Sequence, residues 1–139
     1  MTPADVVDMK IRVLLVDDEP LLMRAITRIL GQRFDLHCVP NGADGLKSMR
    51  ESAYAVVVSD MRMPGMDGAE FLKQARVVSP ETAQILLTGT FSFDEKIADQ
   101  RAEIFACLEK PCPNEALARC IEEAAASVRS ATTAAAKSA

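Results

Sequence analysis

Acidic side chains follow two apolar runs of the sequence, and their types and positions are the clearest sign of chemistry in the chain. Asp17 and Asp18 come directly after the run Ile11–Val16, and Asp60 comes directly after the run Tyr54–Ser59. If the two runs are neighbouring parallel strands, these carboxylates converge at one edge of a sheet. Like charges that close raise one another's pKa and strain the fold unless a cation lies among them. A hard, oxygen-seeking ion suits such a cluster, Mg²⁺ above all.

Two more polar residues lie at the ends of apolar runs. Thr88 closes the run Gln84–Thr88, and Lys110 follows the run Ile104–Leu108, just before Pro111. A lone hydroxyl or ammonium in such a position says little, but both would join the acids if all four runs are strands of one parallel sheet. A phosphoryl group in transfer carries negative charge on its oxygens, which Mg²⁺, an ammonium and a hydroxyl donor can stabilise. The combination favours phosphoryl chemistry over acids that merely cap loops.

The elements that would position these residues alternate regularly along the chain. β-branched and apolar runs predict strands, and apolar residues at helical spacing predict helices between them. In the first helix the apolar face would be formed by Leu22, Ile26, Ile29 and Leu30, with Gly31 as its stop, and Asn41 would cap the second helix. We expect strands over Ile11–Val16, Phe34–Val39, Tyr54–Ser59, Gln84–Thr88 and Ile104–Leu108, and helices over Leu22–Leu30, Asn41–Arg50, Asp67–Val78, Phe93–Arg101 and Pro113–Val128. Five such units predict an α/β, doubly wound, five-stranded parallel sheet in the order 2-1-3-4-5. Ligands then bind outside the carboxyl ends of strands one and three.

The length of 139 residues fits one domain with a sizeable core. We predict an N-terminal extension over residues 1–9, the domain over residues 10–128, and an Ala/Ser/Thr-rich tail over residues 129–139 that either extends the last helix or is disordered. The first ten residues are acidic and lack the apolar segment of a secretory signal. No apolar run approaches the ~18 residues of a membrane span. We therefore expect a cytoplasmic protein.

The charged and thiol residues exclude some other functions. The net charge is −4 and the basic residues are scattered, which argues against direct nucleic-acid binding. Cys38, Cys107, Cys112 and Cys120 form no C-x-x-C pair, so we do not expect a thiolate metal site. His37 alternates with apolar neighbours in its expected strand, and we predict that it faces solvent.

Four segments together resemble one known family across nearly the whole chain. They are VLLVDDEP at Val13–Pro20, VVVSDMRMPGMDG at Val56–Gly68, LLTG at Leu86–Gly89 and EKP at Glu109–Pro111. In this order and spacing they identify residues from about Ile11 to Val128 as similar to a response-regulator receiver domain of bacterial two-component systems. The resemblance implies a flavodoxin-like fold and a domain that is switched by phosphorylation.

The resemblance also implies a role for each residue of the site. Asp60 would be the phosphoacceptor nucleophile. Asp18 and Asp60 would bind Mg²⁺ directly, Asp17 would support the ion through water, and the main-chain carbonyl of Arg62 would be a further ligand. Thr88 would hydrogen-bond the phosphoryl group, and Lys110 would pair with it. Pro64 and Gly65 would shape the loop beyond the nucleophile, and the bond between Lys110 and Pro111 would be cis.

The resemblance further implies the partners. The donor would be a phosphohistidine on a sensor histidine kinase or a histidine phosphotransfer protein, and small acyl phosphates would also serve. The output would be a downstream protein target or a homodimer through the face formed by the fourth helix, fifth strand and fifth helix. We expect no direct contact with nucleic acid or membrane. The chain would not be an enzyme in the usual sense, because its own side chain is the substrate.

Departures from the family pattern concern the switch and its lifetime. Cys107 stands where receivers often carry an aromatic switch residue, and Arg62 and Thr90 occupy positions that modulate dephosphorylation. We expect activation to change the loop Gly89–Asp94 more than the side chain at position 107. Phe91, Phe93 or Phe105 could supply the apolar rearrangement. In the alternative, Cys107 is a small packed residue and the loop acts alone.

Three other interpretations remain to be compared. A Mg²⁺-dependent phosphohydrolase of the haloacid dehalogenase type would carry D-x-D-x-T or D-x-D-x-V after the first strand, whereas this chain has Asp17-Asp18-Glu19-Pro20 and no cap insertion. A degenerate receiver would have lost an acid or the lysine, and this chain keeps them. The chain could also be the N-terminal receiver of a larger regulator whose output domain is missing.

Overall fold

A computed structural model of the chain describes residues 10–89 and 95–138. Its five strands form one parallel sheet in the order β2-β1-β3-β4-β5. They are β1 (Ile11–Val16), β2 (Phe34–Val39), β3 (Val56–Asp60), β4 (Ala83–Thr88) and β5 (Ala106–Glu109). The predicted doubly wound fold and its strand order are confirmed.

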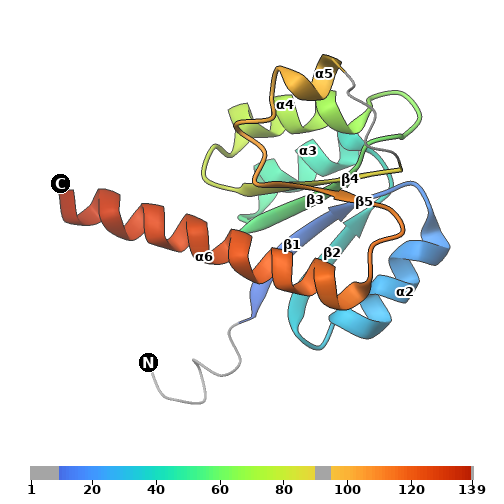
Figure 1. The fold of residues 1–139 in the computed structure, drawn as a ribbon, viewed down its shortest axis with the longest axis horizontal. Coiled ribbons are helices and arrows are strands. Elements are labelled where there is room, and N and C mark those ends of the chain that lie inside the picture. The colour runs from blue at the N-terminus through green and yellow to red at the C-terminus, as the bar shows by residue number, and fades with distance from the viewer. Residues whose placement is uncertain (1–9, 90–94, 139) are drawn as a thin grey trace.

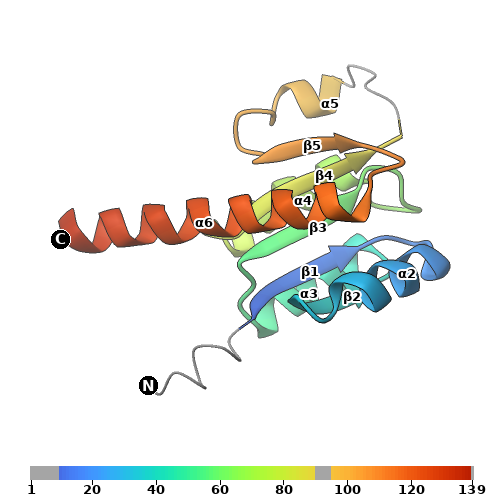
Figure 2. The same cartoon turned by 60° about the horizontal axis from the view of Figure 1, so that its bottom comes forward.

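Helices cover both faces of the sheet (Figures 1 and 2). The described residues form α2 (Pro20–Leu30), α3 (Gly42–Glu51), α4 (Gly68–Val78), the short α5 (Glu95–Ala98) and the long α6 (Asn114–Ser138). α2 and α6 lie on one face, and α3 and α4 lie on the other, where Ile97 of α5 also packs. α6 projects well beyond the sheet at its C-terminal end.

The central strands are buried on both faces because their side chains alternate between two hydrophobic clusters. In β1, Val13 and Leu15 pack towards α2 and α6, whereas Leu14 and Val16 pack towards α3 and α4. All five residues of β3 are buried. This pattern explains why the strands read as continuous apolar runs, and it places the carboxyl ends of β1 and β3 side by side.

Two strands begin two residues later than predicted, and β4 begins one residue earlier, at Ala83 rather than Gln84. β3 begins at Val56 rather than Tyr54, and β5 begins at Ala106 rather than Ile104. Tyr54 and Ile104 are nevertheless buried, since both pack into the cluster under α3 and α4. The apolar run is therefore longer than the strand in each case, because residues before the strand also contribute to the core.

The helices lie where the sequence predicts them, but some of their ends and buried faces differ from the prediction. Asn41 caps α3 by accepting a hydrogen bond from the Asp44 N–H at 2.8 Å, as predicted. α2 ends before Gly31, but this glycine has φ −64°, so the helix stops without a left-handed residue. Ile29, predicted on the buried face of α2, is 52% exposed. The predicted helix Phe93–Arg101 is shorter in the structure, and Phe93 itself lies outside the described residues.

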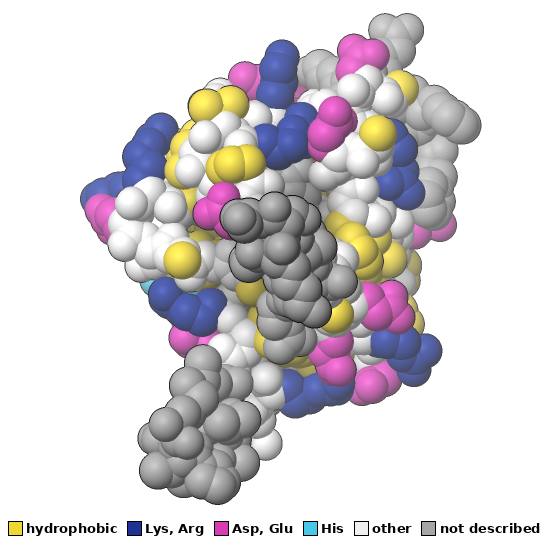
Figure 3. Space-filling view, turned by 90° about the vertical axis from the view of Figure 1, so that its left-hand side faces the viewer, with side chains coloured by type: hydrophobic (Ala, Val, Ile, Leu, Met, Phe, Trp, Pro, Cys, Tyr) yellow, Lys and Arg dark blue, Asp and Glu magenta, His cyan; other side chains and the backbone are white. Residues whose placement is uncertain are grey.

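The surface shows no single-sign charged face in the view of Figure 3. Acidic and basic side chains are interspersed around the end from which α6 projects. His37 is exposed, as predicted. In the part of the chain that the structure describes, no helix is both long enough and apolar enough to cross a membrane.

Candidate functional site

The predicted site residues meet at the carboxyl ends of the central strands. Asp17 follows β1 and is 1% exposed, and its N–H donates to the Val39 carbonyl at 3.1 Å. Asp60 is the last residue of β3 and is 5% exposed. The two strands are hydrogen-bonded neighbours, in which Val16 pairs with Ser59. The fold thus fixes both carboxylates at the same edge of the sheet, as the sequence predicted.

Lys110 lies between these two acids. Its Nζ is 3.1 Å from Oδ1 of Asp60 and 3.4 Å from Oδ2 of Asp17. Lys110 follows β5, and its backbone N–H donates to the Thr88 carbonyl at 2.8 Å. The peptide bond from Lys110 to Pro111 is cis, as predicted. The ammonium from the edge strand therefore reaches across β4 to the acids.

The three carboxylates form a candidate metal site. Oxygen atoms of Asp17, Asp18 and Asp60 all lie within 4.8 Å of one another. Asp17 and Asp60 are buried, whereas Asp18 is exposed and open to solvent. This set of hard oxygen donors, with room for water on the Asp18 side, fits the ligand preference of Mg²⁺. Oδ1 of Asp17 accepts the Glu19 N–H at 2.9 Å, which fixes that carboxylate.

Burial and charge act together on the ionisable groups. Burial raises the pKa of Asp60 above its usual range, and the nearby charge of Asp17 raises it further, although Lys110 partly offsets both. Burial lowers the pKa of Lys110, but its hydrogen bond to Asp60 and the charges of Asp17 and Asp60 outweigh that effect, so the pKa is raised overall. Lys110 therefore stays protonated at neutral pH. One ammonium does not neutralise three carboxylates, and a further cation would be stabilised here.

The connection from β3 to α4 contributes a residue to which the sequence assigned no role. A side chain at Gly68 would place its Cβ 2.3 Å from the Asp60 carbonyl oxygen and 2.8 Å from Cα of Met61. The Gly68 N–H donates to the Met61 carbonyl at 2.7 Å. Asp67 caps α4 by accepting the Glu70 N–H at 2.9 Å. The first turn of α4 therefore lies directly against the backbone of Asp60, which only glycine permits.

The remaining predicted residues lie around the same edge. Thr88 closes β4 and is buried. Arg62 is exposed two residues beyond Asp60. Gly65, predicted to shape this loop, has a positive φ of 79°, a conformation that favours glycine. A signal for Gly68 was present in the sequence, as a glycine directly after an Asp cap, but its contact with Asp60 depends on the folded loop.

The region of the expected switch is described in part. Cys107 is half-buried and packs against the cluster under α3 and α4; burial raises the pKa of its thiol. Phe105 is partly exposed just before β5. Thr90, Phe91 and Phe93 lie outside the described residues.

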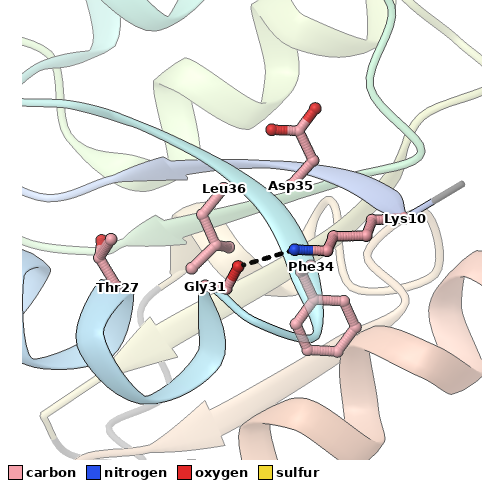
Figure 4. Close-up of a pocket in the computed structure, with 6 residues that line it drawn as sticks. All are labelled: Lys10, Thr27, Gly31, Phe34, Asp35 and Leu36. Atoms are coloured by element: carbon pink, nitrogen blue, oxygen red, sulfur yellow. Dashed lines mark hydrogen bonds between the residues drawn. The ribbon is translucent and has the colours of Figure 1, made fainter. Parts of the chain in front are cut away.

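A pocket of about 410 Å³ lies at the opposite end of the sheet, where α2 ends and β2 begins. It is lined by Lys10, Thr27, Gly31, Phe34, Asp35 and Leu36 (Figure 4). Lys10 donates to the Gly31 carbonyl at 3.4 Å, whereas the Asp35 carboxylate points away from Lys10 and pairs with Arg12. Its polar groups do not converge, so the acidic edge remains the candidate site.

Comparisons with known proteins agree with this geometry. Residues 13–122 match the family model of the response regulator receiver domain. The transcriptional regulatory protein GlrR of Escherichia coli (strain K12) is 31% identical over 112 residues, which cover 80% of this chain and 25% of that protein. The C4-dicarboxylate transport transcriptional regulatory protein DctD of Pseudomonas aeruginosa is 34% identical over 118 residues, covering 84% of this chain and 26% of that protein. The chain thus spans about a quarter of the length of these curated relatives.

A solved structure shows the same likeness in three dimensions. The structure of an adenylate cyclase from Rhodopirellula baltica superposes with a TM-score of 0.83 at 30% identity. The match covers 90% of this chain and 94% of that one.

Proposed function

The chain belongs to the response regulator receiver domain family of two-component systems, and we propose that it is a Mg²⁺-dependent phosphoacceptor whose nucleophile is Asp60. The observation that carries this proposal is the pairing of the Asp60 carboxylate with the Lys110 ammonium at 3.1 Å inside the acidic cluster. A carboxylate held in this way can attack phosphorus while the ammonium receives the phosphoryl oxygens.

The proposed reaction forms one bond and breaks one. A carboxylate oxygen of Asp60 attacks the phosphorus of a phosphohistidine, in line with the P–N bond that breaks. The electron pair of that bond stays on the imidazole nitrogen. Because the other ring nitrogen of the phosphohistidine carries a proton, neutral imidazole leaves, and Asp60 becomes an acyl phosphate. Hydrolysis of the acyl phosphate by water later releases inorganic phosphate and restores the carboxylate.

The residues around Asp60 would each contribute to this reaction. Asp18 and Asp60 would hold Mg²⁺ directly, together with the main-chain carbonyl of Arg62, and Asp17 would hold it through water. When bound, Mg²⁺ supplies positive charge that reduces the repulsion between the carboxylate and the incoming phosphoryl group. Lys110 would turn from the Asp60 carboxylate to the phosphoryl oxygens, and the Thr88 hydroxyl would donate to them.

The partners follow from the family. The donor would be a sensor histidine kinase or a histidine phosphotransfer protein, and the output would pass through the face of α5, β5 and α6 to a protein target or a second copy. The domain would span residues 10–128 and act in the cytoplasm, without binding nucleic acid itself. It would not be a conventional enzyme, because Asp60 is consumed and regenerated within the chain.

A second candidate function rests on the length of the relatives. Since this chain covers only about a quarter of GlrR and DctD, it would act as the N-terminal receiver of a larger regulator, and its output domain would lie in the remainder. The chemistry at Asp60 is the same in both cases.

Intact mass measurement tests the phosphoacceptor directly. Acetyl phosphate with Mg²⁺ should add one phosphoryl group, and Asp60→Asn or excess chelator should abolish the adduct. Asp35→Asn is a matched control, because Asp35 is an exposed acid paired with Arg12 far from the cluster. An undiminished adduct in Asp60→Asn would show that another residue is the acceptor.

A further inference from the structure

A largely buried polar cluster joins α4 to β4 and to the segment between α5 and β5. Arg76, near the end of α4, donates from Nη1 to Oε1 of Gln84 at 2.9 Å and from Nη2 to Oε1 of Gln100 at 2.8 Å. Gln84 lies in β4 and is 2% exposed, and Gln100 follows α5 and is 8% exposed. The planar guanidinium binds the two amide oxygens from two separate nitrogens in a fixed geometry, which a single ammonium nitrogen does not reproduce.

Each glutamine also donates to a backbone carbonyl of α4. Nε2 of Gln84 donates to the Leu72 carbonyl at 2.8 Å, and Nε2 of Gln100 donates to the Ala69 carbonyl at 3.0 Å. Both buried amides therefore have a donor bond and an acceptor bond. Because a buried amide that loses its partners is costly, this arrangement holds the glutamines in one position.

The bond from Gln100 to Ala69 connects the residues after α5 to the turn of α4 that lies against Asp60. Ala69 directly follows Gly68, which lies against the carbonyl of Asp60. A shift of the Asp60 backbone would therefore move the carbonyl that Gln100 binds. Asp60 and Gln100 are thus connected through the first turn of α4 and one hydrogen bond.

α5 is a short helix whose stability depends on its surroundings. The helix has only four residues, too few to be stable without tertiary contacts, and its Ile97 is only partly buried. A pocket of about 350 Å³ lies between α4 and the residues that follow α5, lined on the two sides by residues such as Lys73 and Glu103. The bonds from Gln100 to Ala69 and Arg76 lie beside this pocket, and they hold the residues after α5 against α4.

We propose that Gln100, held by Arg76, is a positioning residue that keeps α5 in its unphosphorylated arrangement and so opposes the switch at Asp60. This inference rests on the proposed function, because it concerns how that site is regulated. If the contact belongs to the unphosphorylated state, then weakening it must favour the other state and tighten the binding of any ligand that prefers that state.

Two measurements on Gln100→Met test this proposal. Met has a similar length but forms neither amide bond. Without ligand, hydrogen exchange in residues 97–105 should become ~5-fold faster or more, while β1 and β3 keep their protection. The affinity for beryllofluoride with Mg²⁺, a mimic of the phosphoryl group, should rise by a similar factor.

Control variants separate this effect from simple destabilisation. Thr82→Val also removes a buried side-chain hydrogen bond, from Thr82 to the Tyr54 carbonyl at 2.9 Å, and should change neither measurement. Arg76→Lys should act in the same direction as Gln100→Met but more weakly, and it serves if Gln100→Met does not fold.

The outcomes are distinguishable. Faster exchange with unchanged or weaker beryllofluoride affinity would overturn the proposal, since the contact would then be purely structural or would belong to the active state. Unchanged exchange in residues 97–105 would overturn it as well. A wild-type chain that does not bind beryllofluoride would instead overturn the phosphoacceptor assignment, while the exchange data would still show whether Gln100 anchors α5.

Discussion

At the scale of single residues, the main feature of the site is an excess of negative charge that Lys110 offsets incompletely. The ammonium contacts Asp17 and Asp60, whereas Asp18 lies exposed at the rim of the cluster. An ion that enters from solvent would meet Asp18 first and would relieve repulsion among all three acids. Glu19, the next residue, is also exposed, but it is absent from the group of converging oxygens.

We therefore expect Mg²⁺ to stabilise the native chain, because it binds the assembled cluster and not the dispersed acids of the unfolded chain. Saturating Mg²⁺ should raise the Tm by about 5 °C or more. Asp18→Asn should remove most of this increase, since it deletes an expected direct ligand. Thermal unfolding with and without Mg²⁺, at constant ionic strength, measures the effect.

Glu19→Gln is the matched control, because it removes one exposed charge at the neighbouring position. It should keep the response to Mg²⁺ nearly intact. Equal losses in the two variants would mean that the ion responds to the general charge of the rim, and an unresponsive wild-type Tm would argue against the site itself.

At the scale of elements, the connection from β3 to α4 determines where the nucleophile sits. α4 begins at Gly68, whose missing side chain lets the helix lie on the backbone of Asp60 and Met61. Gly65 in the same loop has a different requirement. Its φ is positive, but a Cβ there would meet no atom within 4 Å. Glycine is therefore required at position 68 for close packing and favoured at position 65 for its backbone conformation.

Gly68→Ala should both destabilise the fold and impair phosphorylation. Its Cβ would lie 2.3 Å from the Asp60 carbonyl oxygen, so the helix or the nucleophile must move. We expect a loss of about 2 kcal/mol or more in the free energy of unfolding. The rate of phosphorylation by acetyl phosphate should fall on the order of tenfold or more, because small displacements of a reacting group are costly. Urea unfolding and intact mass time courses measure the two effects.

Gly65→Ala should cost about 1 kcal/mol through its positive φ and change the rate much less. A different result would be that the two variants lose phosphorylation rate in the same proportion to their loss of unfolding free energy. That result would show that the contact of α4 with Asp60 does not determine the rate.

At the scale of the whole molecule, the sequence predicts the positions set by the strands far better than the positions set by packing between elements. Asp17, Asp60 and Lys110 could be placed because each lies at the end of an apolar run, and parallel strands end at one edge. Gln84 and Gln100 could not be placed. Glutamine is a mostly exposed residue type, and the burial of Gln84 and Gln100 here depends on their hydrogen bonds to Arg76 of α4.

The same limit applies to the helix faces and to the loop after β4. Helical spacing assigned Ile29 to the buried side of α2, yet in the structure Ile26 and Leu30 alone are fully buried along that helix. The width of the buried face depends on the elements that pack against the helix, and the spacing of apolar residues in the sequence does not determine it. The residues 90–94 lie outside the described part of the chain, so the expected rearrangement there stays a prediction.

That rearrangement is best tested across the molecule at once. Phosphorylation at Asp60 should draw Thr88 towards the phosphoryl group and shift the face of α5, β5 and α6 between two states. Cys107 is a small, half-buried side chain packed against the cluster under α3 and α4. Because it has no aromatic ring that could change rotamer, we expect it to move little. Hydrogen exchange with and without beryllofluoride should therefore change most in the loop Gly89–Asp94, with smaller changes around Cys107. If strand β5 near Cys107 changes while Gly89–Asp94 does not, then the thiol position carries the signal and this prediction is wrong.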